Sequence, residues 1–433
     1  MPRKHSLRFN SLYFSSVGLK QSLVIFLEIL ISPFKDTKQL RKELHRNYSK
    51  LFHEKDTFSF SSARSSLYAC LLAAGIKEGD EVLLTSFTCL AVPTAVIAAG
   101  AIPRYCDIDP FTLDIDTDCL KQNITNNTKA IILQHTLGLA SNISEFKKIV
   151  ADKNIILIED CALSFGSTDS GFLLGTLGDA SIISLELSKT LSSGWGGILV
   201  VNNKKLAKAV AEEYKLIGEL SYLKSMRMAI QLGVSAVLYH PNIYPLGKYI
   251  ISCLFKARLF APSSPASEEN GRVEGDFLAK LPKQLLSISN HQLLRLDEIK
   301  LKHKENSILL RERLIDLKYR VLGKYSNDSD SISPRIPLLI KDRSFFIDYF
   351  HKNGIEIGKW FDGPLSPNPK SDIFNYDANQ YPQACFVARH IVNIPCHYRL
   401  NEDDISLIKK TLSNFAAEFP SHLEVKEISQ HSS

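Results

Sequence analysis

Several features that would assign this chain to a common functional class are missing from it. Its eight cysteines include no pair in CxxC spacing. We therefore expect reduced core cysteines in a cytosolic protein and no metal site. The chain also lacks an uninterrupted apolar stretch of about 18 residues, the length that a membrane-spanning helix needs.

Net charge is nearly absent outside the first 50 residues. These residues contain ten Lys or Arg and three Asp or Glu, a charge of +7, whereas the whole chain carries +6. A body of charge −1 predicts no basic groove for nucleic acid. The same N-terminal arm contains an apolar stretch, residues 22–31, that is too short to cross a bilayer and has no small-residue cleavage site. It predicts an amphipathic helix, packed on the body or lying at a membrane surface.

The apolar and charged fractions, 45% and 23%, are ordinary for a soluble globular protein. Expected strands at 82–84, 102–109, 130–135 and 155–160 alternate with helical segments, which predicts an α/β fold with a mostly parallel sheet covered on both faces. Ligands of such sheets bind at the carboxyl ends of the strands. His135, Asp160 and Lys189 each lie at such an end or just beyond it.

Lys189 follows an apolar run, lies in a Ser/Thr-rich stretch, and precedes a glycine-rich turn (residues 192–197) into another strand. This pattern predicts a half-buried lysine at the end of a sheet. Partial burial favours the neutral amine, which forms a Schiff base with a carbonyl substrate or with pyridoxal phosphate. On the local pattern alone, a surface lysine beside a turn is the commoner explanation.

Two further positions suit a phosphorylated, ring-containing ligand. Asp160 follows four apolar strand residues and needs a cationic or donor partner when buried, for which a protonated pyridine nitrogen is suitable. A helix cap is an equally good explanation. Residues 58–62 read as a serine-rich turn before a helix, whose first N–H groups suit a phosphate. A plain N-cap fits that segment equally well.

We expect four regions along the chain. These are a basic amphipathic arm (1–50), a large cofactor-binding domain (51–275), a small C-terminal domain (276–420) and a disordered tail (421–433). The large domain includes an apolar insertion at about 220–275, which Lys and Arg residues border. The arm and the insertion would bind an anionic bilayer if exposed together, or would cover each other and extend a dimer core.

Five motifs in chain order resemble those of the DegT/DnrJ/EryC1/StrS family of pyridoxal-phosphate sugar aminotransferases, over about residues 58 to 415. The motifs are Gly79-Asp80-Glu81-Val82 with Thr88, Asp107-Ile108-Asp109, Gln134-His135-Thr136-Leu137-Gly138, Ile158-Glu159-Asp160-Cys161-Ala162, and Ser184 through Lys189 to Gly196-Gly197.

The resemblance implies a fold-type-I transferase, with a large domain built on a mostly parallel sheet and a smaller C-terminal α/β domain. It also implies a homodimer with pyridoxal 5′-phosphate as cofactor. In this resemblance Lys189 is the catalytic Schiff-base lysine and Asp160 the partner of the pyridine nitrogen. Ser184, helped by Arg64 and Ser65, binds the cofactor phosphate. His135 is also placed in the cofactor site, as is Cys89, where the family often has an aromatic residue.

The expected function is transfer of an amino group, from glutamate, to a keto group of a nucleotide-activated sugar in glycan or polysaccharide biosynthesis. The expected location is the cytoplasm, with peripheral contact at the inner membrane face. A sugar dehydratase of the same family is an alternative, but that branch has histidine where this chain has Lys189. A non-catalytic regulatory or scaffold protein is another, because Cys89 and Leu163 depart from the family pattern.

Overall fold

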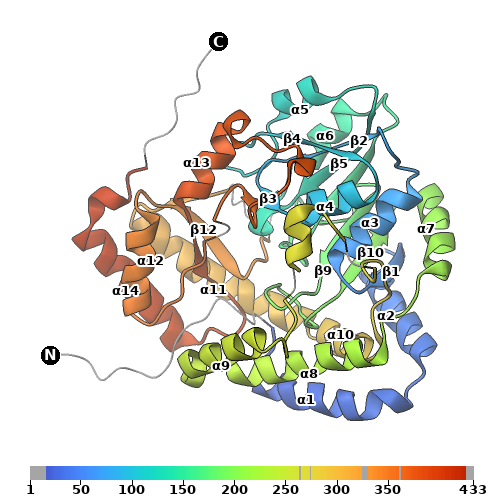
Figure 1. Ribbon diagram of the computed structural model, residues 1–433. Coiled ribbons are helices and arrows are strands. Elements are labelled where there is room, and N and C mark those ends of the chain that lie inside the picture. The colour runs from blue at the N-terminus through green and yellow to red at the C-terminus, as the bar shows by residue number, and fades with distance from the viewer. Residues whose placement is uncertain (1–15, 263–264, 274, 324–329, 360–361, 426–433) are drawn as a thin grey trace.

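The computed structural model describes residues 16–262, 265–273, 275–323, 330–359 and 362–425. Its centre is a seven-stranded sheet of order β1-β10-β9-β6-β5-β2-β4 (Figure 1). The strands are β1 (Asp56–Phe60), β2 (Glu81–Thr85), β4 (Ile102–Cys106), β5 (Thr128–Gln134), β6 (Ile156–Asp160), β9 (Ala180–Ser184) and β10 (Gly197–Val201). Neighbouring strands from β9 to β4 are parallel, whereas β10 is antiparallel to β1 and β9. The expected mostly parallel sheet is confirmed.

Helices cover both faces of this sheet. Because successive strand residues point to opposite faces, Ile158 packs with α3, α4 and α7 while the preceding Leu157 packs with α5 and α6. Strands buried on both sides need near-continuous apolar runs, which β2, β5, β9 and β10 have. These helices are α3 (Ala63–Ala73), α4 (Ala91–Ala98), α5 (Thr117–Asn123), α6 (Ile143–Ile149) and α7 (Lys204–Leu216).

The serine-rich segment expected to be a turn forms the edge strand β1 instead. It alternates polar and apolar residues and pairs with β10, so that Phe58 and Phe60 join the core. Ser59 is fully buried because its hydroxyl contacts the Arg41, His45 and Tyr214 side chains. Buried partners of this kind let a serine occupy a strand interior.

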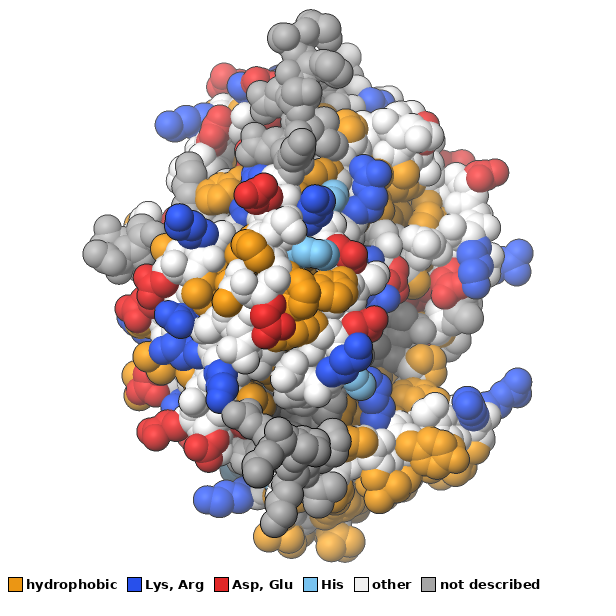
Figure 2. All heavy atoms as spheres, turned by 90° about the vertical axis from the view of Figure 1, so that its left-hand side faces the viewer, with side chains coloured by type: hydrophobic (Ala, Val, Ile, Leu, Met, Phe, Trp, Pro, Cys, Tyr) orange, Lys and Arg blue, Asp and Glu red, His pale blue; other side chains and the backbone are white. Residues whose placement is uncertain are grey.

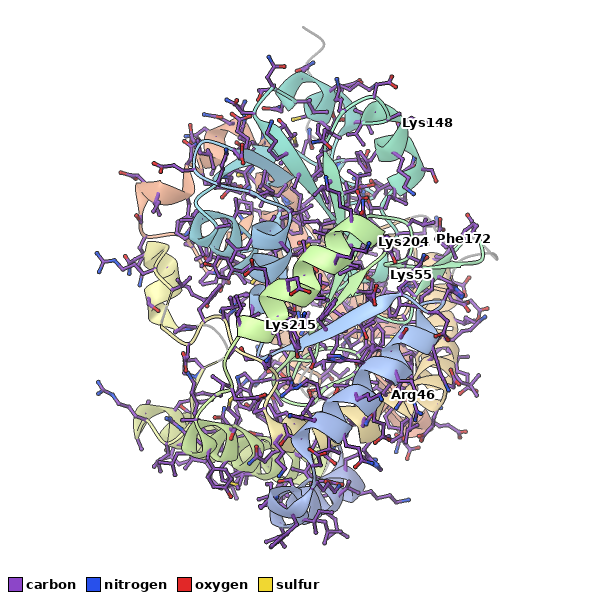
Figure 3. All side chains as sticks on the ribbon, turned by 90° about the vertical axis from the view of Figure 1, so that its right-hand side faces the viewer. Arg46, Lys55, Lys148, Phe172, Lys204 and Lys215 are labelled. Atoms are coloured by element: carbon purple, nitrogen blue, oxygen red, sulfur yellow. The ribbon has the colours of Figure 1, made fainter. Side chains whose placement is uncertain are left out.

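The N-terminal arm is part of the large domain rather than a separate region. Its helices are α1 (Leu19–Ile31) and α2 (Thr37–Leu51), joined by the 3₁₀ turn η1 (Ser32–Phe34). Ile25, Leu44 and Tyr48 pack in one core with Ile183 and Ile198 of the sheet. Figure 3 shows α2 and α7 on one face of the molecule, where the labelled Arg46, Lys204 and Lys215 are exposed.

The apolar insertion forms α8 (Tyr222–Leu238), η3 (Pro241–Ile243), α9 (Tyr244–Lys256) and η4 (Ala266–Asn270). In Figure 1, α1, α8 and α9 lie together along the lower edge of the molecule. Within the described residues, no helix combines the length and the hydropathy needed to cross a membrane.

The small domain is built on the sheet β11-β12-β14. Its elements, with the connecting pieces, are α10 (Lys283–Leu293), α11 (Leu296–Asp316), β11 (Arg320–Val321), β12 (Arg335–Leu339), α12 (Arg343–Lys352), β13 (Leu365–Ser366), η5 (Asp372–Phe374), η6 (Ala378–Gln380), α13 (Pro382–His390), β14 (Ile391–Pro395), α14 (Glu402–Glu418) and η7 (Pro420–His422). Short pieces of the large domain are β3 (Thr88–Cys89), η2 (Thr136–Gly138), β7 (Thr168–Asp169) and β8 (Phe172–Leu173).

The expected boundary at residue 276 is followed by α10. Helix α10 packs with α1, α2 and α8. Helix α11 then crosses over, because Leu296 and Ile299 belong to the large-domain core and Leu310 and Leu314 to the small one. The start of the expected disordered tail is ordered, since His422 packs on Phe345. Residues 426–433 lie outside the described residues.

One segment of the C-terminal region returns to the large domain. Strand β13 pairs with β3, and α13 packs into the same core as α3 and α4. Asp107, just past the end of β4, accepts hydrogen bonds from the N–H groups of Gln383 and Ala384 at the start of α13. This carboxylate at a helix N-terminus fixes the segment beside the carboxyl ends of the large-domain strands.

Gly197 allows β10 to approach the first turn of α3. A Cβ atom there would overlap the backbone of Ser62 and Ala63. We predict that Gly197→Ala lowers the free energy of unfolding by about 1–3 kcal/mol, since the backbone must shift to relieve the overlap. Urea unfolding measures this. The control is Gly218→Ala, where a Cβ atom meets nothing within 4 Å, and an equal loss in both variants would contradict the prediction.

Candidate active site

A cavity of about 440 Å³ lies at the carboxyl ends of β5, β6 and β9. Its wall includes the last residue of each of these strands, Gln134, Asp160 and Ser184, together with Lys189. The small domain contributes Arg335, at the start of β12, and Lys359. The volume lies in the range of small-molecule sites, and the position is the one that open α/β sheets use for ligands.

Lys189 is half-buried in the loop between β9 and β10. The loop is held at its base by hydrogen bonds from Leu185 N to Gly196 O and from Ser193 N to Leu185 O. Gly194 and Gly196 adopt φ values of 87° and 132°, which favour glycine. Lys189 N donates to Glu186 O within the same turn. The loop therefore presents the lysine at the cavity, as expected from the sequence.

Asp160 is buried at the cavity wall, with 5% of its surface exposed. Its Oδ1 accepts a hydrogen bond of 2.9 Å from Ala162 N, which closes a turn, and no helix begins there. Within the described residues, no hydrogen bond reaches its Oδ2. Burial raises the pKa of this carboxyl, although Ala162 N–H and the charges of Lys189 and His135 oppose the rise. A cationic N–H donor in the cavity would stabilise the ionised form.

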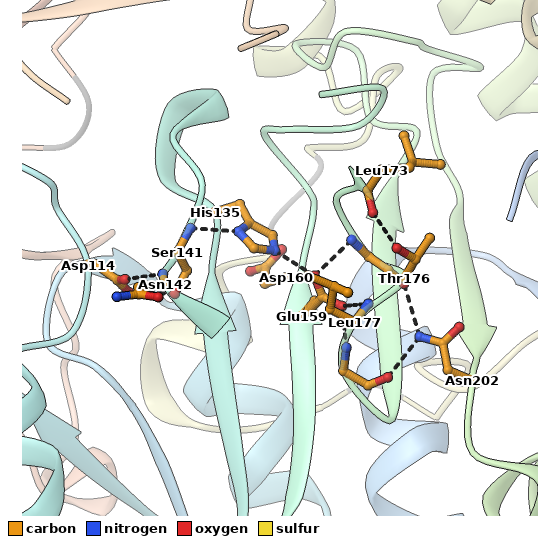
Figure 4. Close-up of polar contacts among 12 residues, drawn as sticks. Asp114, His135, Ser141, Asn142, Glu159, Asp160, Leu173, Thr176, Leu177 and Asn202 are labelled. Atoms are coloured by element: carbon orange, nitrogen blue, oxygen red, sulfur yellow. Dashed lines mark hydrogen bonds and ion pairs between the residues drawn. The ribbon is translucent and has the colours of Figure 1, made fainter. Parts of the chain in front are cut away.

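The neighbouring residue, Glu159, is the centre of a buried polar cluster (Figure 4). Its carboxylate accepts hydrogen bonds from the N–H groups of Gly175, Leu177 and Gly178 and a fourth, of 2.9 Å, from His135 Nε2. Burial alone would raise the pKa of Glu159, but these donors lower it below its ordinary value. Glu159 is therefore a fully partnered anion under the end of β6.

His135 belongs to this cluster and does not line the cavity. Its Nδ1 accepts a hydrogen bond of 3.0 Å from Ser141 N, so Nε2 carries the proton that it donates to Glu159. Cys161 lies beside both residues. The ring nitrogens and carboxylate oxygens are all engaged, so the geometry is that of a hydrogen-bonded unit. The sequence placed His135 in the cofactor site, whereas the structure places it behind Asp160.

The start of α3 contributes one charged side chain to the cavity. Ser62 caps the helix by accepting a hydrogen bond of 3.1 Å from Ser65 N. Arg64 lines the cavity and forms an ion pair with Glu268, a buried residue of η4. Ser65, in contrast, is fully buried and donates to Phe277 O, so it lies outside the cavity wall.

The structure thus brings five of the expected residues to one cavity and leaves two behind it. The five are Lys189, Asp160, Ser184, Arg64 and Cys89; the two are Ser65 and His135. Burial raises the pKa of the Cys89 thiol, so this residue is a neutral wall group rather than a thiolate.

Sequence reasoning missed three charged residues of the wall. Glu186 lies inside a motif that was identified, and its carboxylate accepts hydrogen bonds from Ser188 N and Oγ. Arg335 and Lys359 come from the small domain, and no sequence signal marks their approach. Of the four wall cations, Arg64 and Lys359 form ion pairs with Glu268 and Asp362, and the other two are Lys189 and Arg335.

The chain is similar to known proteins in sequence and in structure. The model of the DegT/DnrJ/EryC1/StrS aminotransferase family matches residues 26–234 and 277–413. GDP-perosamine synthase of Escherichia coli O157:H7 is 34% identical over 165 residues, 38% of this chain and 45% of that protein. The L-glutamine:2-deoxy-scyllo-inosose aminotransferase of Streptomyces kanamyceticus is 32% identical over 176 residues, 41% of each. The chain therefore matches less than half the length of either relative.

Solved structures share the fold over nearly the whole chain. The sugar aminotransferase CalS13 from Micromonospora echinospora superposes with a TM-score of 0.68 at 20% identity, covering 93% of this chain and 99% of that one. A Streptococcus pneumoniae protein in its PLP form gives 0.71 at 18% identity, with 94% and 98% covered. At these identities the superpositions establish the fold.

Glu159→Gln tests the buried cluster. We predict that it lowers the free energy of unfolding at neutral pH by about 3 kcal/mol, because an amide NH₂ would face N–H donors. The lowered pKa of Glu159 contributes stability above its ordinary pKa, and this contribution disappears as pH falls through the folded-state value. Urea unfolding of both proteins across acidic pH should show the difference shrinking; a constant difference would contradict the assignment.

Proposed function

Because the chain belongs to the DegT/DnrJ/EryC1/StrS aminotransferase family, we propose that it transfers an amino group from glutamate to the keto group of a nucleotide-activated sugar. The observation that carries the proposal is the placement of Lys189 and Asp160 on the wall of one cavity. A pyridoxal phosphate enzyme needs both groups: an amine that bonds to the aldehyde carbon of the cofactor, and a carboxylate that pairs with the ring nitrogen.

The cofactor of this family is pyridoxal 5′-phosphate, and the residues present fit it. The second oxygen of Asp160 suits a protonated ring nitrogen, and the wall is rich in cations that suit a phosphate. Ser184, at the end of β9, and Arg64, in the first turn of α3, would hold that phosphate. When bound, the cofactor supplies a carbonyl for amino-group exchange and a ring that accepts electrons from the substrate carbon.

Each side chain then has a defined task. Lys189 would carry the cofactor through its Nζ and, once released by the amino donor, would move a proton at that same atom. Asp160 would keep the ring nitrogen protonated, and burial would strengthen this interaction. The presence of Lys189 also argues against the dehydratase alternative, in which histidine occupies this position.

The substrate class follows from charge and from the relatives. Arg335 and Lys359 extend the cationic part of the wall beyond the residues assigned to the cofactor. A nucleotide-activated sugar carries a pyrophosphate, which such cations bind. One relative is named as a GDP-perosamine synthase, a name that supports a nucleotide-linked sugar as the acceptor in this chain too.

The cellular setting is also a proposal. It comprises a homodimer in the cytoplasm, with peripheral contact at the inner membrane face, that serves glycan or polysaccharide biosynthesis. The family resemblance supports the dimer, and the eight free cysteines support a reducing compartment. Light scattering of the purified protein measures the oligomeric state.

Lys189 is tested by covalent trapping. We predict that borohydride, added after pyridoxal phosphate, fixes the cofactor on the peptide that contains Lys189, and that Lys189→Ala gives no adduct. Peptide mass spectrometry locates the residue that carries the adduct. Lys359→Ala is the matched control, since Lys359 lines the same cavity and its loss should leave the adduct in place. A wild-type chain without adduct would favour the scaffold alternative.

Asp160→Asn separates chemistry from folding. We predict that the variant still forms the trapped adduct and keeps its unfolding midpoint, whereas amino transfer falls about a hundredfold or more. The reason is that a neutral amide does not hold the proton on the ring nitrogen. The assay incubates the enzyme with glutamate and a panel of nucleotide ketosugars and detects the amino sugar by mass spectrometry. Unchanged turnover at saturating cofactor would leave Asp160 with a role in the turn alone.

A further inference from the structure

Three neighbouring helices leave apolar faces in solvent. Leu23 and Leu30 project from α1, Leu223 and Ile230 from α8, and Leu246 and Tyr249 from α9; we call these six residues the apolar edge. They are 43–80% exposed. In Figure 2 hydrophobic side chains gather along the lower edge of the molecule, where Figure 1 places these helices.

The apolar edge is separate from the inner faces of these helices, which are buried in the protein core. Ile25 of α1 and Leu232 of α8 are buried in the core beneath them. Gly233 lets the Phe26 ring lie against the backbone of α8, because a Cβ atom there would overlap that ring. The helices are therefore apolar on two sides, which a surface helix of a protein that meets only water does not need.

The charged residues around the apolar edge include more cations than acids. Residues 221–267 contain five Lys or Arg and no Asp or Glu. The nearby acids Glu28, Asp276 and Glu356 form ion pairs with Lys35, Lys224 and Lys248. At the end of α9, Lys256 and Arg258 are exposed, and no acid among the described residues pairs with either.

We propose that the apolar edge binds the face of an anionic lipid bilayer. Helices with an apolar outer face and flanking cations lie in the plane of a bilayer, with the apolar side chains below the headgroups and the cations among the lipid phosphates. This inference does not depend on the proposed amino transfer.

A second copy of the chain fits this surface less well. In a two-fold interface both copies would bring Lys256 and Arg258 to the contact, and neither cation has an acid partner among the described residues. The family match is also interrupted at residues 235–276, which contain the whole of α9.

Vesicle flotation of the full-length protein tests the proposal. We expect flotation with vesicles that contain phosphatidylglycerol and not with phosphatidylcholine alone, and a severalfold loss between about 0.05 and about 0.5 M salt. The variant Leu30→Gln/Leu223→Gln/Leu246→Gln removes one apolar contact from each helix and should lose most of the flotation. Lys256→Gln/Arg258→Gln should weaken flotation and reduce its salt dependence.

The matched control is Phe172→Gln/Leu216→Gln/Ile373→Gln. These three side chains are 50–83% exposed on elements outside the three helices, so flotation should be unchanged. Unfolding midpoints and pyridoxal phosphate trapping on Lys189 report the fold of each variant. Absence of flotation in the wild type would overturn the proposal, as would equal loss in the control. A wild-type dimer that the apolar-edge variant turns into a monomer, without flotation, would assign the surface to a second copy.

Discussion

The geometry of the cavity depends on the hydrogen bonds of one buried carboxylate, that of Glu159. Its four hydrogen bonds join the end of β6 to the loop at 175–178 and, through His135, to the end of β5. Adjacent strand residues point to opposite faces, so an anchored Glu159 fixes the direction of Asp160. A charge buried this deeply is stable only when its donors are all present. The cluster is thus a support for the cavity wall and keeps Asp160 in a single orientation.

The arrangement of parallel strands explains why the site could be located from the sequence. Asp160, Ser184 and Lys189 follow apolar strand runs, and parallel strands end at one edge of a sheet. Periodicity therefore predicted the sheet and the meeting of Asp160 and Lys189, whereas the family resemblance added Ser184. His135 also ends a strand, but the pattern does not reveal which face its ring occupies. Its hydrogen bonds with Glu159 and Ser141 decide that, and they require the folded loops.

Other features depend on contacts far apart in the chain, which local patterns do not contain. Strand β1 was not predicted because the buried Ser59 hydroxyl depends on contacts with Arg41, His45 and Tyr214, which are distant in the sequence. Arg335 and Lys359 reach the cavity only because the small domain packs against the large one. The packing of α10 is another such feature, because its apolar residues contact the N-terminal helices, which lie more than 230 residues earlier in the chain.

The insertion connects the apolar edge to the cavity in a fixed geometry. Glu268, near its end, is paired with Arg64 on the cavity wall, and Asp276 is paired with Lys224 at the start of α8. Gly194, in the loop that carries Lys189, packs against Leu232 of α8. Helices tied at several points to a rigid sheet cannot tilt independently of it, because close-packed contacts do not stretch continuously. A bilayer bound at the apolar edge would therefore hold the cavity at one height and one orientation above its surface.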